Sequence, residues 1–489
     1  MKRKSKAFED HVMTLTKSPQ INVGVKMTWK IHTLLFAGIL LVTSCVTTRY
    51  ERPEMNTSNL YRDNTSEDTT SMADLEWKKL FSDPVLQDLI EKGLAGNLNL
   101  KQAVERIAIS QAYLKQSKMA FLPSLQLDIT STDAKQSGRA INAPKGFIKL
   151  TTHTNRIQLG TSWEADIWGK LRSAKRGAIA GMLQSDASKR AIQTQLIVDI
   201  ANTYYNLLAL DKQLKITQET IELRKKEVET LTALQESGKV TSAEVLQSQA
   251  NQYAAEVMVP ELQNQVWQAE NMLNYLLARG PEKITRGTLD EQVIYTDLRL
   301  GVSSQLLKNR PDVQEAEYAF IAAFENTNVA KTYFYPSLTL TANGGFASFK
   351  IQDLFSQSIF YNIIGGLTQP IFNRGQNKAR LRTAKAEQQI AFYHFQDVIL
   401  RSGMEVSNAL YAYQNAVERE RIRKQQIESL GIAVENTQEL LSNRNEINYT
   451  DVLSSEQNLI AAQMNEINDK LDQLQSVVNL YRALGGGWK

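Results

Sequence analysis

The feature that most constrains the fold is an internal repeat. Residues 121–125 (FLPSL) match residues 334–338 (FYPSL) at an offset of 213, and residues 238–246 match residues 445–453 at an offset of 207. Three positions near the ends of the copies match at that second offset: Leu273, Leu277 and Gly280 with Leu480, Leu484 and Gly487. A chain that repeats a unit of roughly 200 residues is expected to build the same supersecondary unit twice.

The repeat divides the chain into five parts. Residues 85–280 form the first copy, 281–301 the linker between copies, and 302–487 the second copy. Residues 1–44 read as a leader, and residues 45–84 as an N-terminal tether. Residues 46–76 are polar and poor in large apolar side chains, so we expect this part of the tether to follow the surface of something else.

Each copy is expected to run helix, strand, loop, strand, long helix, turn, helix. Residues 171–236 contain no proline and carry a heptad seam that is interrupted at Thr217 and Arg224; its apolar members are Leu207, Leu210, Leu214, Ile221, Val228 and Leu231. A periodic stretch of this length predicts coiled-coil packing. Gly238 and its equivalent Asn445 follow the long helices, where both residue types tolerate the left-handed backbone of a tight turn.

Four segments alternate apolar and polar residues with a period of two. They lie at about 124–132, 155–166, 337–346 and 360–370. Strands of about ten residues suit a bilayer crossing, which needs about 9–11 tilted residues. A soluble sheet alternates in the same way, but the secretion signal described below and the carboxylates on the polar faces favour a water-filled lumen.

Four strands cannot close a barrel by themselves. In lipid, an open strand edge leaves N–H and C=O groups unsatisfied at several kcal/mol each. The smallest outer-membrane barrels have about 8 strands, so several chains must share one barrel. Two chains would give eight strands and three would give twelve, and the residues alone leave both open.

The leader reads as a lipoprotein signal. Residues 1–44 carry seven Lys/Arg and two Asp/Glu, and the apolar run at 34–42 is too short to span a bilayer. Thr43 and Ser44 precede the single cysteine, Cys45, as in a bacterial lipobox. We therefore expect Cys45 to carry a diacylglyceryl group, the alternative being a buried free cysteine. Met27 is a plausible true start.

Composition removes several classes of function. His11 and His32 lie in the leader, so one cysteine and two histidines remain, fewer than the roughly four ligands of a structural zinc site. A single cysteine also excludes a disulfide framework and disfavours Cys-His catalysis. Nucleotide-binding and HExxH motifs are absent, and no cofactor or metal ligand set is expected. Beyond residue 44 the chain holds 49 Lys/Arg against 50 Asp/Glu, so the body is near neutral and we expect no nucleic-acid partner.

The chain resembles the TolC-type outer-membrane efflux proteins, and in particular their NodT-type lipoprotein branch. The segments that carry the resemblance are YERP at 50–53, WKKLFSDP at 77–84, WEADIWGKLR at 163–172, LLKNRPDV at 306–313 and QPIFNRG at 369–375. The resemblance implies an α+β membrane protein in which a homotrimer builds a twelve-stranded β-barrel joined to a periplasmic coiled-coil α-barrel. It also implies a passive exit duct that joins a periplasmic adaptor and an inner-membrane pump of the resistance-nodulation-division type.

By the same resemblance, the helix-turn-helix tips at 234–246 and 441–453 meet the adaptor and form the gate. The adaptor-contact candidates are Gly238, Val240, Glu244, Val245, Asn445, Tyr449, Asp451 and Val452. The gate candidates are Arg444, Glu446 and Asp451, for which a plain surface turn is an equal alternative. The second tip departs from the family with Asn445 in the glycine position, and the first with Glu244 in place of aspartate.

Three other functions are alternatives to the efflux duct. A type I secretion conduit for polypeptides shares its architecture. A lipid-anchored coiled-coil scaffold has no use for four amphipathic strands, and an enzyme is disfavoured because the chain shows no nucleophile-base or metal set. Two polar clusters have structural interpretations: residues 166–169 as a strand-to-helix junction, and Arg310-Pro311-Asp312 as a helix start. The sequence contains no Met-rich or His-rich tract that would indicate metal ions as the exported substrate.

Overall fold

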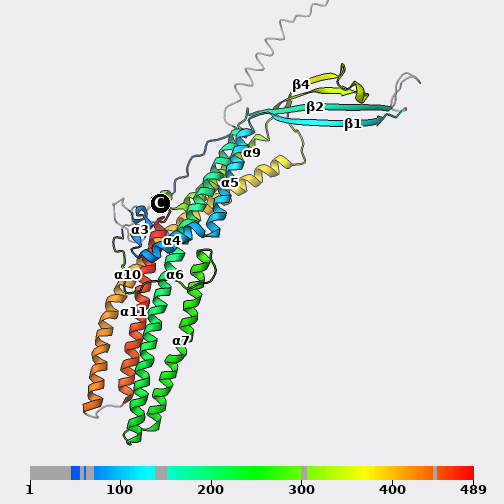
Figure 1. Ribbon diagram of the computed structural model, residues 1–489. Helices are drawn as coiled ribbons and strands as arrows, with labels where there is room; N and C mark the ends of the chain where they lie inside the picture. Colours follow the sequence, from blue (N-terminus) through cyan, green and yellow to red (C-terminus); the bar gives the residue numbers. More distant parts are fainter. Residues whose placement is uncertain are drawn as a thin grey trace, which may run out of the picture.

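The computed structural model describes residues 46–55, 60–61, 71–137, 151–298, 305–443 and 449–488. The leader, Cys45 and three tip candidates (Arg444, Asn445 and Glu446) lie outside these residues. The molecule is elongated, with a β-sheet at one end and helical hairpins extending away from it (Figure 1). Among the described residues, no helix combines the length and apolarity needed to cross a membrane.

The sheet contains four antiparallel strands in the order β1-β2-β3-β4. These strands are β1 (Ser124–Lys135), β2 (Thr151–Ala165), β3 (Ser337–Ser348) and β4 (Ile359–Thr368). β1 and β3 begin at the expected residues, and the other strand ends differ from the expected ranges by one to four residues. β2 begins earlier because its polar residues 151–154 continue the ladder with β1, and β4 ends before Pro370, which has no N–H to donate to a ladder.

The two faces of the sheet differ sharply in polarity. Register pairs such as Leu127 with Leu159 and Ala342 with Ile363 place apolar residues on one face. The large apolar side chains exposed on this face are Leu125, Leu127, Ile129, Leu159, Trp163, Leu338, Leu340, Ile359, Tyr361, Ile363 and Leu367. The opposite face carries residues such as Gln126, Asp128, Gln158, Asn343 and Asn362. One face therefore suits lipid and the other suits water.

Two very long helices span the helical part. α6 (Lys170–Glu236) has 67 residues and α10 (Gln376–Asn443) has 68, which at 1.5 Å per residue is about 100 Å each. The other main helices are α4 (Pro84–Gly96), α5 (Leu98–Met119), α7 (Ser242–Leu276), α9 (Pro311–Thr332) and α11 (Tyr449–Leu484). The short ones are η1 (Met72–Asp74), α3 (Trp77–Leu80), α8 (Leu306–Asn309) and η3 (Ile351–Asp353). The expected order of elements within two repeats is confirmed.

In each repeat, two shorter helices stack end to end beside a long one. Asn97, at the start of α5, donates its side-chain N–H to the Leu276 carbonyl at the end of α7 (2.9 Å). Arg310, at the start of α9, donates to the Ala483 carbonyl at the end of α11 (2.9 Å). Asn97 and Arg310 are related by the offset of 213, and Leu276 and Ala483 by 207. The repeat therefore conserves a joint in which a polar side chain satisfies a free helix-end carbonyl.

The main core lies at these joints. Its fully buried members include Leu86, Ile200, Tyr204, Leu273 and Tyr481. The Tyr204 hydroxyl donates to Asp83 (2.6 Å) and accepts from the Gly287 N–H (3.2 Å), so this buried phenol is fully paired. Below the core, α7, α6, α11 and α10 run side by side as two hairpins (Figure 1).

Candidate functional site

The junction between sheet and helices is built from residues 164–172. Gly169 precedes α6 with φ at +79°, a conformation that glycine adopts without cost. Asp166 accepts hydrogen bonds from the backbone N–H groups of Leu171 and Arg172 (2.8 and 3.0 Å) and so caps the helix. The Trp168 indole N–H donates to the Pro336 carbonyl in the other repeat (2.7 Å). The interpretation of residues 166–169 as a strand-to-helix junction is confirmed.

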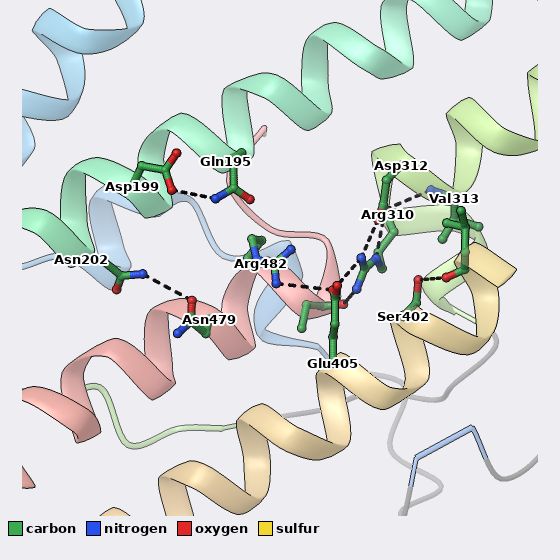
Figure 2. Close-up of polar contacts among 12 residues, drawn as sticks. Gln195, Asp199, Asn202, Arg310, Asp312, Val313, Ser402, Glu405, Asn479 and Arg482 are labelled. Carbon is green, nitrogen blue, oxygen red and sulfur yellow. Dashed lines mark hydrogen bonds and ion pairs between the residues drawn. The ribbon is translucent and has the colours of Figure 1, made fainter. Parts of the chain in front are cut away.

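Arg310 holds a second junction, where α9 begins. Its guanidinium pairs with Asp312 (3.0 Å from Nε) and with Glu405 of α10 (2.8 Å), and Glu405 also pairs with Arg482 (3.4 Å) (Figure 2). The two cations balance the two carboxylates. Although burial opposes the shift, hydrogen bonding and charge from Arg310 lower the pKa of Asp312. The predicted helix start at Pro311 is confirmed.

The first helical tip is a compact turn. Gly238 has φ at +74°, and the N–H groups of Gly238 and Lys239 donate to the carbonyls of Gln235 and Leu234 (2.9 Å each), which ends α6 in a Schellman motif. Thr241 and Glu244 form a capping box at the start of α7. Two of the adaptor-contact candidates, Gly238 and Val240, lie in this turn, and Glu244 is engaged in the cap.

At both tips the second helix turns an apolar residue inward. Val245 in α7 and Val452 in α11 are buried, with exposed fractions of 6% and 3%. Tyr449 begins α11 and is half-buried, whereas Asp451 is exposed. The two valines therefore help to hold their hairpins together, and among the described tip candidates Gly238 and Asp451 are exposed.

Pairs of polar side chains link the two hairpins along α6 and α11. Asn202 contacts Asn479 (3.4 Å), Gln213 contacts Asn468 (3.1 Å), and Arg224 contacts Glu456 (2.9 Å). The α6 members are 11 residues apart, which is three turns of a nearly straight helix. The contact nearest the tips is an ion pair. This row is not among the predicted features, and its one signal in the sequence is the break in the heptad seam at Arg224.

Arg224 is the centre of a buried charged cluster. Its side chain is 4% exposed and donates to both Glu227 (2.8 Å) and Glu456 (2.9 Å). Burial, followed by the hydrogen bond and charge of Glu227, raises the pKa of Glu456 to about 7. Burial and the charge of Glu227 also raise the pKa of the nearby Tyr449 phenol. One carboxylate in this cluster therefore lacks a full counter-charge.

The N-terminal segment follows α9 towards the junction with the sheet. Arg52 pairs with Glu317, Tyr50 packs edge-on against Phe320 and Phe324, and Thr48 accepts from the Asn328 side chain through its carbonyl (2.9 Å). Thr47 then lies against Gly169 at the start of α6. Residues 47–52 thus follow the surface of α9 up to the start of α6.

Among the described residues, no group of three or more His, Cys, Asp or Glu side chains is placed to hold a metal ion. The polar groups described above instead join elements to one another. The distinctive features are a sheet with one apolar face, two helices about 100 Å long that form hairpins with α7 and α11, and a charged cluster between the hairpins. A family model described as "Outer membrane efflux protein" matches residues 89–279 and 302–486.

The chain belongs to the outer membrane efflux protein family. It is 28% identical over 475 residues to the probable efflux pump outer membrane protein TtgC of Pseudomonas putida, covering 94% of this chain and 96% of TtgC. It is 27% identical to the probable outer membrane lipoprotein SilC of Salmonella typhimurium, covering 94% and 99%. The open-state MtrE channel of Neisseria gonorrhoeae superposes with a TM-score of 0.80 at 26% identity, over 91% of this chain and 98% of MtrE.

Family membership fixes the class of function. This efflux-family chain is an outer-membrane channel of tripartite efflux pumps, and not an enzyme. Its fold is that of the solved family channels, since OprN also superposes with a TM-score of 0.81. The resemblance to TolC-type efflux proteins is confirmed, as is the outer-membrane location.

Proposed function

We propose that three copies of this channel close one twelve-stranded barrel and form a passive exit duct for small molecules. The observation that carries the proposal is the sheet itself: its exposed face is apolar, and β1 and β4 are both unpaired edges within one chain. Neighbouring copies satisfy these edges by pairing β4 with β1. Three copies are favoured over two because an eight-stranded barrel is filled by its own side chains, whereas twelve strands leave a lumen.

The helical part supports the same assembly. α7 and α10 lie at the two sides of the row of hairpins. Both expose large apolar side chains, including Tyr253, Val257 and Trp267 on α7 and Tyr411, Val417 and Ile422 on the hairpin half of α10. The α7 side of one copy therefore fits the α10 side of the next, and this head-to-tail contact closes a ring around a central axis.

Lipid attachment at Cys45 complements the barrel. Thr47 lies beside Gly169 at the junction of strand and helix, and two residues span at most about 7 Å. A lipid on Cys45 therefore reaches the membrane surface without unfolding the tether. Metabolic labelling with a tagged fatty acid tests the site: the parent is labelled and Cys45→Ala is not, whereas labelling of the mutant would place the lipid elsewhere.

The tips are proposed to meet a periplasmic adaptor that joins the duct to an inner-membrane pump of the resistance-nodulation-division type. Val240 and Asp451 are accessible in the structure, so photo-crosslinking residues at these positions are expected to capture the adaptor. The buried Val452 serves as the matched control position. The gate is proposed to involve Asp451 together with Arg444 and Glu446, and Asp451→Ala is expected to raise the leak conductance in planar bilayers.

Efflux is tested against polypeptide secretion in the native host. Deletion of the gene is expected to raise the intracellular retention of at least one class in a panel of dyes, solvents, antibiotics and metal cations. Re-expression of the parent chain restores export, and the profile of secreted polypeptides does not change. Normal retention of the whole panel together with lost secretion of a polypeptide would favour a type I secretion conduit instead.

A further inference from the structure

A cavity of about 560 Å³ lies between the two hairpins, beside the Arg224 cluster. Its walls come from α6, α10 and α11, and the apolar contributors include Ile216, Leu231, Val434, Val452 and Ile460. This volume lies within the range of about 300–1,000 Å³ that is typical of small-molecule sites. The cavity combines apolar walls with a small number of polar groups at one place, which is the general pattern of a ligand site.

The polar groups give the cavity a negative charge. Arg224 and Glu227 face Glu456 from α6, Tyr449 faces it from α11, and α10 contributes the neutral Gln438. One cation and two carboxylates leave a charge of −1. The lining residues Glu219 and Lys226 are both exposed and cancel each other. The uncompensated charge belongs to the pair formed by Glu227 and Glu456, whose side chains are only 16% and 19% exposed.

We propose that this cavity binds an amphipathic organic cation. The apolar body of the ligand packs against the aliphatic walls, and its single positive charge lies against Glu227 and Glu456. Charge complementarity selects a cation over a neutral or anionic molecule, because the cation supplies the missing counter-charge. A bound cation contacts both hairpins at once and therefore links them close to the tips.

Binding is coupled to the ionisation of Glu456. The free cluster shares a proton near neutral pH, because the pKa of Glu456 is raised to about 7. The cation favours the ionised carboxylate, so occupation releases that proton to solvent. The affinity of the parent protein is therefore expected to rise as the pH is raised from 5.5 to 8.5, and the rise is lost when Glu456 cannot ionise.

The test uses the full-length protein in nanodiscs of zwitterionic lipid, with empty nanodiscs subtracted. Rhodamine 6G is the cationic probe and N-phenylnaphthylamine the neutral one, and binding is followed by fluorescence anisotropy. Glu456→Gln, which keeps the side-chain shape, is expected to weaken rhodamine 6G binding at pH 8 by at least tenfold. Val434→Trp, which fills the cavity, is expected to abolish it, whereas Glu428→Gln on the exposed side of α10 leaves it unchanged.

Three outcomes would overturn the proposal. In the first, rhodamine 6G binds the parent and Glu456→Gln equally at pH 8. In the second, the neutral probe binds as tightly as the cation and responds to the same variants. In the third, neither probe binds but Val434→Trp abolishes binding of the purified adaptor, which would assign the cavity to that protein. The measurement does not depend on export, so it separates this inference from the proposed duct function.

Discussion

Two buried arginines hold the helices of this channel together, and their surroundings differ in charge. Arg310 and Arg482 face Asp312 and Glu405, so that junction is neutral overall. Arg224 faces two carboxylates, those of Glu227 and Glu456, so its cluster carries an excess negative charge. The neutral junction suits a fixed joint near the core. The charged cluster suits a contact that changes with pH or ligand.

Arg310→Ala is expected to destabilise the helical part by about 3–5 kcal/mol, because it leaves buried carboxylates without their partner. Arg310→Lys is expected to recover only part of this loss, since lysine lacks the fork that reaches Asp312, Glu405 and the Ala483 carbonyl together. Denaturant unfolding measures the change. The matched control is Arg401→Ala, which removes an exposed ion pair with Asp397 worth less than about 1 kcal/mol. Equal losses in both variants would contradict the account.

Glu456→Gln is expected to stabilise the contact between hairpins at pH 8 and to have little effect at pH 4. The folded-state pKa of Glu456 lies near 7, above the usual value of 4.5. Folding therefore favours the protonated form, and stability falls as the pH rises from about 4.5 to 7. The cost above pH 7 is of the order of 1–3 kcal/mol. Hydrogen exchange at the tips as a function of pH measures it, and a pH-independent difference would refute this assignment.

At the scale of elements, the strands, the long helices and the turn at Gly238 could be predicted from the sequence. Each leaves a local pattern: alternation with a period of two for the strands, a heptad seam for the long helices, and a glycine at the helix end for the turn. The row of contacts at Asn202, Gln213 and Arg224 was not foreseen, because such pairings depend on how the hairpins lie against each other. The short helices α3 and α8 leave no periodic signal, since each has only four residues.

The repeat offers an internal comparison at the ends of α7 and α11. Ala278 ends α7 in a Schellman turn with φ at +56°, and its equivalent in the second copy is Gly485, with φ at +97°. A side chain in this region costs about 1 kcal/mol. Ala278→Gly is therefore expected to stabilise the protein by up to about 1 kcal/mol, as measured by its thermal midpoint. Gly485→Ala is the opposite control, because its Cβ would lie 2.6 Å from the Asn309 backbone.

Adjacent residues of β1 test which face of the sheet meets lipid. Leu127→Arg places a charge on the apolar face, where it costs about 2–4 kcal/mol near the bilayer midplane. Gln126→Arg places the same charge on the polar face and is expected to leave assembly intact. The yield of heat-resistant, membrane-inserted protein measures both. Normal insertion of Leu127→Arg, or failure of Gln126→Arg alone, would reverse the assignment of the faces.

At the scale of the whole molecule, the proposed trimer takes a third of each layer from each chain. The sheet has two open edges, the row of hairpins has two apolar sides, and the N-terminal segment follows α9 towards the sheet. All three features fit the proposed assembly, in which neighbouring copies close a ring and a lipid on the N-terminal segment anchors it. The number of copies could not be derived from the sequence, because strand closure alone permits two or three chains.

Disulfide cross-linking between strand edges tests the shared barrel most directly. One cysteine replaces Gln126 on β1, and a second is moved along the polar face of β4 through Phe360, Asn362 and Ile364, with each single variant as control. Oxidation in outer membranes is expected to give covalent dimers and trimers for at least one pair, and no larger species. A ladder that ends at the dimer would support an eight-stranded barrel, and the absence of any cross-linked product would contradict a barrel shared between chains.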